Sequence, residues 1–168
     1  VTRNIARIDT GTRTVMLDDG EVLRARTVIL ATGVAWRRLA IDGFDRFIGK
    51  GIYYGAARSE ASNTQGLDVH LIGAGNSAGQ AALFFASYAR SVTLLVRGDA
   101  LESSMSHYLV EQVRTKPNVH VLTRTEVVGV HGDGHLAAID LADRGNGTAQ
   151  RTDCGGLFVF IGADAQTQ

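Results

Sequence analysis

Residues 69–78 read Val69-His70-Leu71-Ile72-Gly73-Ala74-Gly75-Asn76-Ser77-Ala78, and this stretch decides the fold. Its apolar start, 69–72, predicts a buried strand, and the alanine-rich residues from 76 to about 90 predict a helix. A strand, a glycine turn and a helix in this order form the setting that the G-x-G-x-x-G/A motif requires. The sequence therefore predicts a binding site for a dinucleotide.

The small residues of this turn each have a physical role. Gly73 and Gly75 let the backbone turn sharply and approach a pyrophosphate, and the helix that follows offers N–H groups and the positive end of its dipole. Small Ala78 lets that helix lie close to the strand. We expect the pyrophosphate to be held by Gly73, Gly75, Asn76, Ser77 and Ala78. The alternative is a glycine turn that only joins a strand to a helix.

Strand and helix alternate again after the motif. The apolar run 92–96 predicts a second buried strand, a helix is expected from Ser103 or Ser104 to Thr115, and 118–122 predicts a third short strand. Strand, helix, strand, helix, strand is the βαβαβ unit of a parallel sheet.

The C-terminal part predicts antiparallel structure. Residues 126–130 and 136–141 flank a glycine turn and 148–152 form a third weak strand, so we expect a three-stranded meander. A last buried strand, 157–161, ends at Gly162. The predicted fold class is α/β, with a Rossmann-like parallel sheet and an antiparallel β-meander.

The N-terminal part also predicts β structure. The first 23 residues alternate between polar and apolar, and Asp19-Gly20 signals a hairpin. The continuous apolar run 27–30 predicts a further strand, which ends in Ala31-Thr32-Gly33. Residues 34–66 are polar and punctuated by glycines, so they are predicted to be a connector and not part of the core.

Composition argues against several functions. The 168 residues carry 17 basic and 17 acidic side chains, so charge gives no basis for binding nucleic acid or an anionic membrane surface. No apolar run approaches the roughly 20 residues that span a bilayer, and a cytoplasmic location is expected. Cys154 is the single cysteine, which excludes an internal disulfide and a cysteine-based metal cluster. His131 and His135 are separated by a glycine turn, so no metal site is expected.

The residue after the second predicted strand bears on the choice of cofactor. An acidic residue there hydrogen-bonds the ribose of NAD, whereas a basic one meets the 2′-phosphate of NADP. Arg97 occupies this position and favours NADPH over NADH, and Ser103 and Ser104 offer hydroxyl donors. Asp99 and Glu102 count against a tight phosphate site, and a merely solvated charge at Arg97 is the alternative.

In this order, the motifs resemble the thioredoxin reductase-like branch of the pyridine nucleotide-disulfide oxidoreductases, over almost all of the chain. Residues 27–33 match an A-T-G segment of that family's FAD-binding domain, and Ile41-Asp42-Gly43 is similar to its I-P-G. Residues 73–78 with Gln80 match its nucleotide turn, G-G-G-N-S-A, and 157–162 match the strand that closes its NADPH domain.

The resemblance implies a two-domain flavoprotein with FAD and NADPH (or NADH) as cofactors. Residues 1–47 would be a remnant of the FAD-binding domain, 48–162 the NAD(P)H-binding domain, and 163–168 the start of the return to the FAD-binding domain. The family's N-terminal dinucleotide motif and its C-terminal FAD segment have no counterpart here. We therefore expect an internal fragment of a homodimeric parent.

The same resemblance implies roles for individual residues. Thr32 and Gly33 would form one edge of the FAD domain, and Ile161 and Gly162 would flank the pyridine nucleotide. Gln80 would orient the nicotinamide ring, and the alternative is an ordinary polar residue in a first helical turn.

Two departures from the family matter. Where thioredoxin reductases carry a C-x-x-C pair, Gly55 and Arg58 occupy the cysteine positions, and disulfide exchange needs a thiolate and a second thiol. Arg97 matches the first arginine of the family's 2′-phosphate motif, but Gly98 replaces the second and Glu102 replaces a third basic residue. The resemblance is therefore to cysteine-free relatives, and the choice between NADP and NAD stays open.

Three functions remain. The first is the NAD(P)H-binding part of an FAD-dependent oxidoreductase, which passes hydride from NADPH to the flavin and on to an unidentified electron acceptor. The cofactors carry that chemistry, so no catalytic side chain is expected, and the fragment alone is expected to be inactive. The second is an NAD(P)-binding sensor or regulatory module without catalysis. The third is a fragment of a flavin-dependent monooxygenase, against which the antiparallel meander argues.

Overall fold

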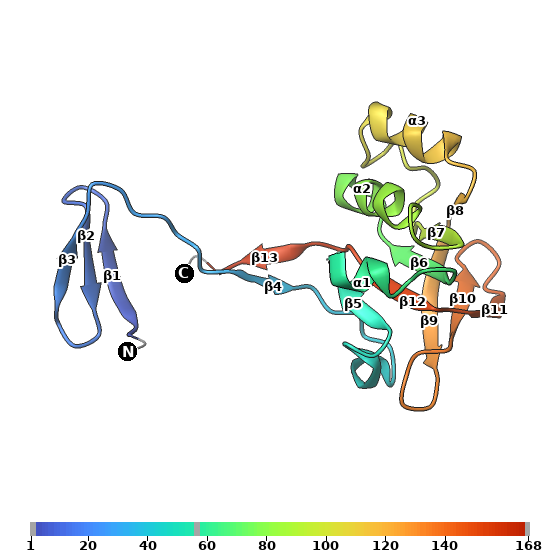
Figure 1. Ribbon diagram of the computed structural model, residues 1–168, viewed down its shortest axis with the longest axis horizontal. Coiled ribbons are helices and arrows are strands. Elements are labelled where there is room, and N and C mark those ends of the chain that lie inside the picture. Colours follow the sequence, from blue (N-terminus) through green and yellow to red (C-terminus); the bar gives the residue numbers. More distant parts are fainter. Residues whose placement is uncertain (1–2, 56–57, 167–168) are drawn as a thin grey trace. The chain divides into compact units, whose positions relative to one another are not determined.

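The computed structural model describes residues 3–55 and 58–166, and the chain forms two compact units (Figure 1). The first contains residues 1–35 and 165–168, and the second contains residues 36–164. The boundary expected between residues 47 and 48 falls inside the second unit, and the division into FAD- and NAD(P)H-binding domains stays a prediction. None of the described helices combines the length and the apolar composition that crossing a bilayer takes.

A five-stranded parallel sheet forms the middle of the second unit. From edge to edge its strands are β5 (Ile52–Tyr54), β12 (Gly156–Val159), β6 (Asp68–Ile72), β7 (Ser91–Leu95) and β8 (Val119–Leu122). Every neighbouring pair is parallel. The inner strands are near-continuous apolar runs, as expected where both faces of a sheet are covered. The predicted α/β class is confirmed.

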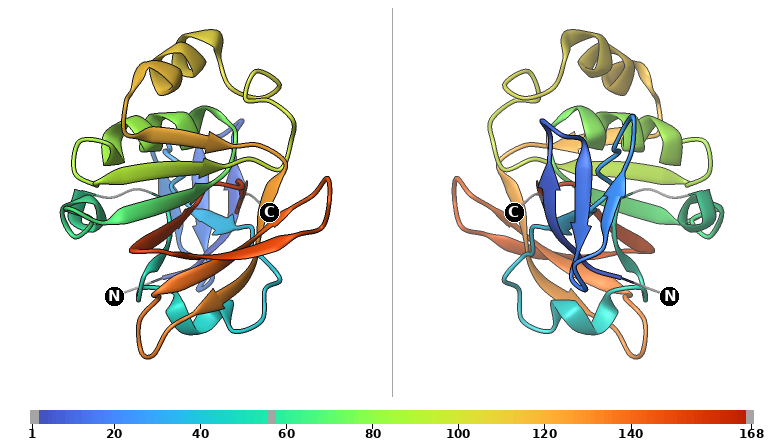
Figure 2. Two further views of the ribbon diagram at one scale, coloured as in Figure 1. Left: turned by 90° about the vertical axis from the view of Figure 1, so that its right-hand side faces the viewer. Right: turned by 90° about the vertical axis from the view of Figure 1, so that its left-hand side faces the viewer.

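Two helices, α2 (Asn76–Phe85) and α3 (His107–Thr115), cover one face of this sheet (Figure 2). A shorter helix, α1 (Arg58–Ser62), precedes β6. Apolar side chains of the two longer helices meet those of the strands in one buried cluster. The cluster includes Leu71, Ala78, Ala82, Phe85, Leu94, Val110 and Val113.

Both longer helices are shorter than predicted. Helix α2 ends at Phe85 and not near residue 90, because the chain tightens there: Tyr88 N donates to Phe85 O at 2.9 Å, a three-residue step. Helix α3 begins at His107 and not at residue 103 or 104. The N–H of Ser106, just before it, donates to Asn76 Oδ1 at 2.8 Å, which holds the preceding residues as a loop.

A three-stranded antiparallel meander covers the other face of the sheet, as predicted (Figure 2). Its strands are β9 (Thr125–His131), β10 (Ala138–Asp143) and β11 (Ala149–Asp153), in the order β11-β10-β9. Ile72 of β6 and Leu95 of β7 join a second buried cluster with apolar residues of this meander. Successive side chains of a strand point to opposite faces, so the same strands supply both clusters.

The prediction that residues 34–66 are only a connector is wrong. Strand β5, an edge of the parallel sheet, lies here, and Ile52 in it is fully buried. The 3₁₀ helix η1 (Phe44–Phe47) buries both of its phenylalanines in the same cluster as Ile52. These elements have three and four residues, too few to show a periodicity, and pairing with β12 is what fixes β5 as a strand.

The first unit contains the predicted antiparallel strands, β1 (Ile5–Asp9), β2 (Thr14–Leu17) and β3 (Val22–Arg24). The strand predicted at 27–30 is wrong: these residues are irregular, and Ile29 is 86% exposed. An apolar run becomes a strand only where a neighbour accepts and donates its backbone hydrogen bonds. No described strand pairs with this run.

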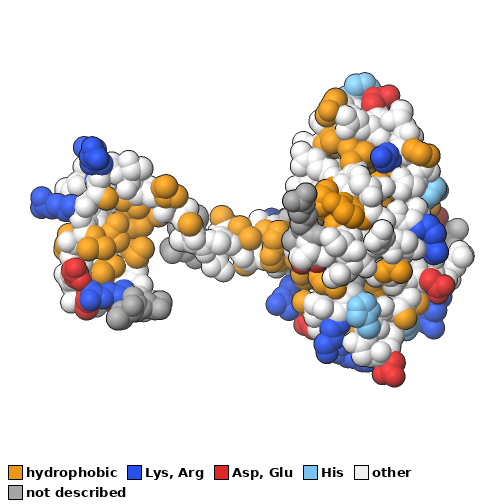
Figure 3. Space-filling view, viewed as in Figure 1, with side chains coloured by type: hydrophobic (Ala, Val, Ile, Leu, Met, Phe, Trp, Pro, Cys, Tyr) orange, Lys and Arg blue, Asp and Glu red, His pale blue; other side chains and the backbone are white. Residues whose placement is uncertain are grey.

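Apolar side chains gather on the surface of the first unit (Figure 3). Leu17 is the one apolar residue among the described residues up to 35 that is buried. The exposed large apolar residues of this unit include Ile5, Met16, Val22, Leu23, Ile29 and Leu30. Two further short strands, β4 (Val34–Trp36) and β13 (Ala163–Ala165), pair with each other.

Candidate functional site

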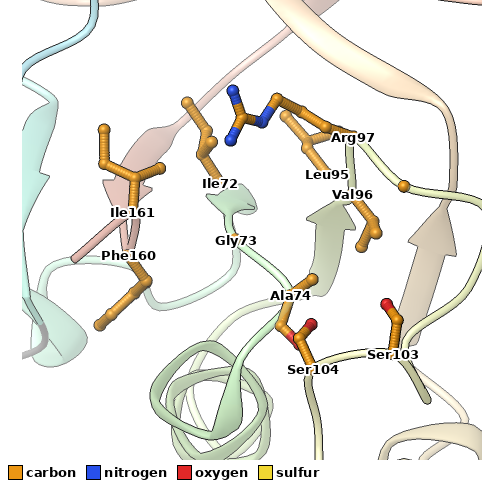
Figure 4. Close-up of a pocket in the computed structure, with 11 residues that line it drawn as sticks. Ile72, Gly73, Ala74, Leu95, Val96, Arg97, Ser103, Ser104, Phe160 and Ile161 are labelled. Atoms are coloured by element: carbon orange, nitrogen blue, oxygen red, sulfur yellow. The ribbon is translucent and has the colours of Figure 1, made fainter.

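A pocket of about 250 Å³ opens beyond the carboxyl ends of β6 and β7 (Figure 4). Strand β6 lies between β7, which follows it in the chain, and β12, which comes near the C-terminus. Open α/β sheets bind ligands at such a point, where the strand order reverses. The lining residues include Gly73 and Ala74 after β6, Arg97 and Gly98 after β7, Ser103, Ser104 and Ile161.

Gly73 is required by the fold itself. Its φ of 147° lies in the region that side chains disfavour, and an added Cβ would lie 2.6 Å from the carbonyl oxygen of Phe160. Its N–H donates to Leu95 O at 3.1 Å, which ties the turn to the neighbouring strand. The first glycine of the motif therefore permits the close approach of β6 to the end of β12.

Gly75 is under no such constraint. Its φ of −84° is open to any residue, and an added Cβ would meet only Ser104 O, at 4.0 Å. Nothing in the described chain fills the space in front of this residue. A glycine here leaves that space for a group that comes close to the backbone, as a pyrophosphate does.

The start of α2 presents unused backbone donors to this space. Gly75 is the N-cap, no side chain caps the helix, and its first turn contains no acidic residue. The first N–H groups of a helix have no partner within the helix, and the dipole places partial positive charge there. Ser77 and Gln80 are exposed, whereas Ala78 is fully buried against the sheet, as its predicted role requires.

A loop from residue 98 to 106 forms one wall, and the glycine turn holds it in place. Asn76 Oδ1 accepts from Ser106 N at 2.8 Å, and Ser104 Oγ donates to Ala74 O at 2.9 Å. Met105 of the same loop lies on Gly79, where an added Cβ would be 2.8 Å from its sulfur. Sequence reasoning missed this contact, although a further glycine directly after the motif was a signal for it.

Arg97 leaves the end of β7 exposed to solvent, and its side chain reaches across the mouth of the pocket towards Ile72 (Figure 4). Ser103 lines the same pocket, and its hydroxyl donates to Ala100 O at 3.0 Å. Glu102 pairs with Arg114 of α3 at 2.5 Å. A hydrogen bond from its own backbone and the charge of Arg114 lower the pKa of Glu102. This carboxylate is thus already paired within the protein.

The remaining predicted residues lie in two places. Ile161 lines the pocket, and Gly162, with a φ of 97°, accepts from Arg37 N at 3.2 Å. Thr32 and Gly33 belong to the first unit, where Thr32 lines a separate hollow of about 470 Å³. The structure therefore brings Gly73, Arg97 and Ile161 into one pocket beside the start of α2.

Two reactive side chains lie outside this pocket. Cys154 is buried, which raises the pKa of its thiol to about 12, so it is a passive thiol as expected. His70 is a core residue as expected, but it is not satisfied, because Nδ1 has no hydrogen-bond partner in the part of the chain that the structure describes. No described group of three histidine, cysteine or acidic side chains is placed to hold a metal ion.

A parallel sheet with a glycine turn at its switch point defines the nucleotide-binding class of α/β folds. The comparison with known families agrees: the model for the pyridine nucleotide-disulphide oxidoreductases matches residues 1–168. The chain belongs to this family.

The relatives are consistent with this family. An alkyl hydroperoxide reductase protein from Staphylococcus epidermidis is 35% identical over 159 residues, covering 95% of this chain and 31% of that protein. A thioredoxin reductase from Mycolicibacterium smegmatis is 34% identical over 156 residues, covering 93% of this chain and 49% of that protein. The chain therefore spans between about a third and a half of the length of these relatives.

Solved structures show the same fold. Thioredoxin reductase from Giardia duodenalis superposes with a TM-score of 0.83 at 23% identity, covering 99% of this chain and 54% of the other. The enzyme from Lactococcus lactis gives 0.78 at 22% identity, covering 94% of this chain and 51% of the other. The chain is thus thioredoxin reductase-like in fold and in sequence.

Proposed function

We propose that this chain binds a reduced pyridine nucleotide, NADPH in preference to NADH, as the nucleotide-binding part of an FAD-dependent oxidoreductase. The observation that carries the proposal is Gly75, a glycine that neither its backbone angle nor its surroundings require. It lies at the uncapped start of α2, at the switch point of the sheet. A ligand that comes close to the backbone at this point explains the residue, and the family membership agrees with a pyridine nucleotide.

The residues of the site divide the work of binding. The first N–H groups of α2, from Asn76 to Ala78, would hold the pyrophosphate, and Arg97 would meet the 2′-phosphate. Ile161 would contact the nucleotide from the end of β12, and exposed Gln80 would orient the nicotinamide. When bound, the nicotinamide supplies a hydride and the flavin accepts it. The chain itself contributes position and charge.

Electrons would leave the flavin by a route other than a disulfide in this segment. Disulfide exchange needs an attacking thiolate and a second thiol. Gly55 and Arg58 stand at the positions of the family's cysteine pair. Cys154, the one cysteine of the chain, is buried with its pKa raised to about 12, so almost no thiolate forms at neutral pH.

Titration of the chain with NADPH tests the proposal, with Gly75→Ala as the decisive variant. The new methyl group fits the backbone and meets no atom closer than 4.0 Å, so stability should not change. It occupies the space in front of α2, so the affinity for NADPH should fall at least tenfold, about 1.4 kcal/mol. Gly11→Ala is the matched control, because Gly11 lies far along the chain and an added Cβ there makes only an ordinary contact, 3.4 Å from Asp9.

Gly73→Ala should behave in the opposite way. Its methyl group would lie 2.6 Å from Phe160 O at a φ of 147°, so it should lower the free energy of unfolding by about 2 kcal/mol or more, seen in urea titrations. Unchanged NADPH binding by a well-folded Gly75→Ala variant would refute the proposal, and so would a wild-type chain that binds no nucleotide.

A further inference from the structure

Three arginines from distant parts of the sequence meet where β7 ends. Arg97 follows β7, Arg124 lies between β8 and β9, and Arg144 lies between β10 and β11. Backbone hydrogen bonds join them: Arg124 N donates to Gly98 O at 2.9 Å, and Arg144 N donates to Arg124 O at 2.7 Å. The side chain of Arg144 completes the contact, because its Nη1 donates to Arg97 O at 3.2 Å.

Much of this positive charge is free to bind an anion. The guanidinium groups of Arg97 and Arg124 are exposed, and neither pairs with a carboxylate among the residues that the structure describes. Arg144 Nε lies 3.6 Å from Glu126 Oε2, which is longer than a hydrogen bond, and the arginine side chain is 52% exposed. Such a surface pair is weak, so it leaves most of the capacity of Arg144 to donate hydrogen bonds.

Two other carboxylates lie near these arginines in the chain. Asp143 Oδ1 accepts from the N–H of Gly145 at 2.6 Å, so it is engaged in its own turn. Asp99 is exposed and follows Gly98 directly. An added Cβ on Gly98 would meet no atom within 4 Å, so open space adjoins the backbone where the family's motif has its second arginine.

We infer that Arg124 and Arg144 replace that second arginine, so that Arg97, Arg124 and Arg144 together bind the 2′-phosphate and select NADPH over NADH. This inference rests on the proposed function, in which the pocket binds a pyridine nucleotide. Guanidinium groups suit the role because their planar N–H donors match the oxygens of a phosphate in pairs. The selectivity then comes from the turns of the meander and not from the loop after β7 alone.

Dissociation constants for NADPH and for NADH, measured on the same preparations, test the inference. Arg144→Ala should weaken NADPH binding roughly tenfold and leave NADH binding within about twofold, and Arg124→Ala should act in the same direction. Arg144→Lys, which keeps the charge but loses the paired donors, should fall between wild type and Arg144→Ala. Arg38→Ala is the control, because Arg38 is an exposed arginine of the same unit whose partner is the exposed Asp45, 3.3 Å away.

The ratio of the two constants does not depend on the fraction of protein that is folded, so a destabilised variant still gives an answer. Equal losses for both nucleotides on Arg144→Ala, or no loss of NADPH binding, would overturn the inference. A wild-type chain that binds NADH as tightly as NADPH would also overturn it and would leave nucleotide binding intact. Binding of neither nucleotide would instead refute the proposed function, and the inference with it.

Discussion

Gly73 and Gly75 stand two positions apart in the turn but answer to different constraints. The first is fixed by the protein, through a φ of 147° and the nearby carbonyl of Phe160. The second has an ordinary φ of −84° and open space before it. In the sequence the two glycines belong to one motif, and only the three-dimensional surroundings separate a folding requirement from a binding one.

His70 gives a prediction about pH at the same scale. Burial lowers its pKa to about 4, from 6.5, so the folded state favours the neutral ring. Below pH 6.5 the unfolded chain takes up a proton that the folded chain refuses, so stability falls as the pH falls from 6.5 towards 4. For this shift the loss between pH 7 and pH 5 is about 2 kcal/mol.

Urea unfolding of wild type and His70→Asn at pH 7 and pH 5 measures this term. The variant lacks the titrating ring, so its stability should change less between the two pH values, by about 2 kcal/mol. The carboxylate of Asp68, whose pKa is lowered to about 2 by hydrogen bonds from Arg90 and Ser91, titrates below this window and does not interfere. Parallel pH profiles for the two proteins would contradict the assignment.

At the scale of elements, the loop from residue 98 to 106 and the start of α2 act as one unit. Asn76 reaches from the helix to Ser106 N, and Ser104 reaches back to Ala74 O. The walls of the pocket are therefore held in position by the protein, which reduces the ordering cost of binding.

Replacing Asn76 with alanine should release this loop. The lost hydrogen bond should cost about 1 kcal/mol of stability, and the amide of Ser106 should exchange faster with deuterium. NADPH affinity should also fall, because the wall becomes mobile. Asn63→Ala is the matched control at an exposed asparagine of the same unit, and equal exchange at Ser106 in both variants would show that Asn76 does not hold the loop.

The sequence predicted the long or strongly patterned elements correctly. Strands β6, β7 and β12 are apolar runs that are buried on both faces, and the meander alternates around glycine turns. Strand β5 was out of reach, because three residues carry no period and their role depends on pairing with β12. The run at 27–30 failed for the converse reason, since apolar residues alone provide no partner strand.

The candidate site was predictable in part for similar reasons. Gly73, Arg97 and Ile161 lie at ends of elements that local sequence defines, and all three line one pocket. The approach of Arg124 and Arg144 to the end of β7 joins residues up to 47 positions apart. Nothing in the local sequence of either turn indicates that contact, which is set by the packing of the meander.

At the scale of the whole chain, the family model matches residues 1–168, yet the chain spans only 31% and 49% of two of its relatives. The second unit has two buried clusters and a covered sheet. The described part of the first unit buries Leu17 alone and exposes several large apolar residues. The nucleotide-binding prediction therefore belongs to the second unit, in which its residues are held by a packed core.

The most direct test of the central claim is to locate NADPH on the chain by NMR, following backbone amide signals during a titration. The account predicts saturable shifts of the amides from residue 73 to 78 and at Arg97 and Gly98, and loss of these shifts in Gly75→Ala. Shifts confined to other parts of the chain, or shifts at the turn that persist in Gly75→Ala, would contradict it.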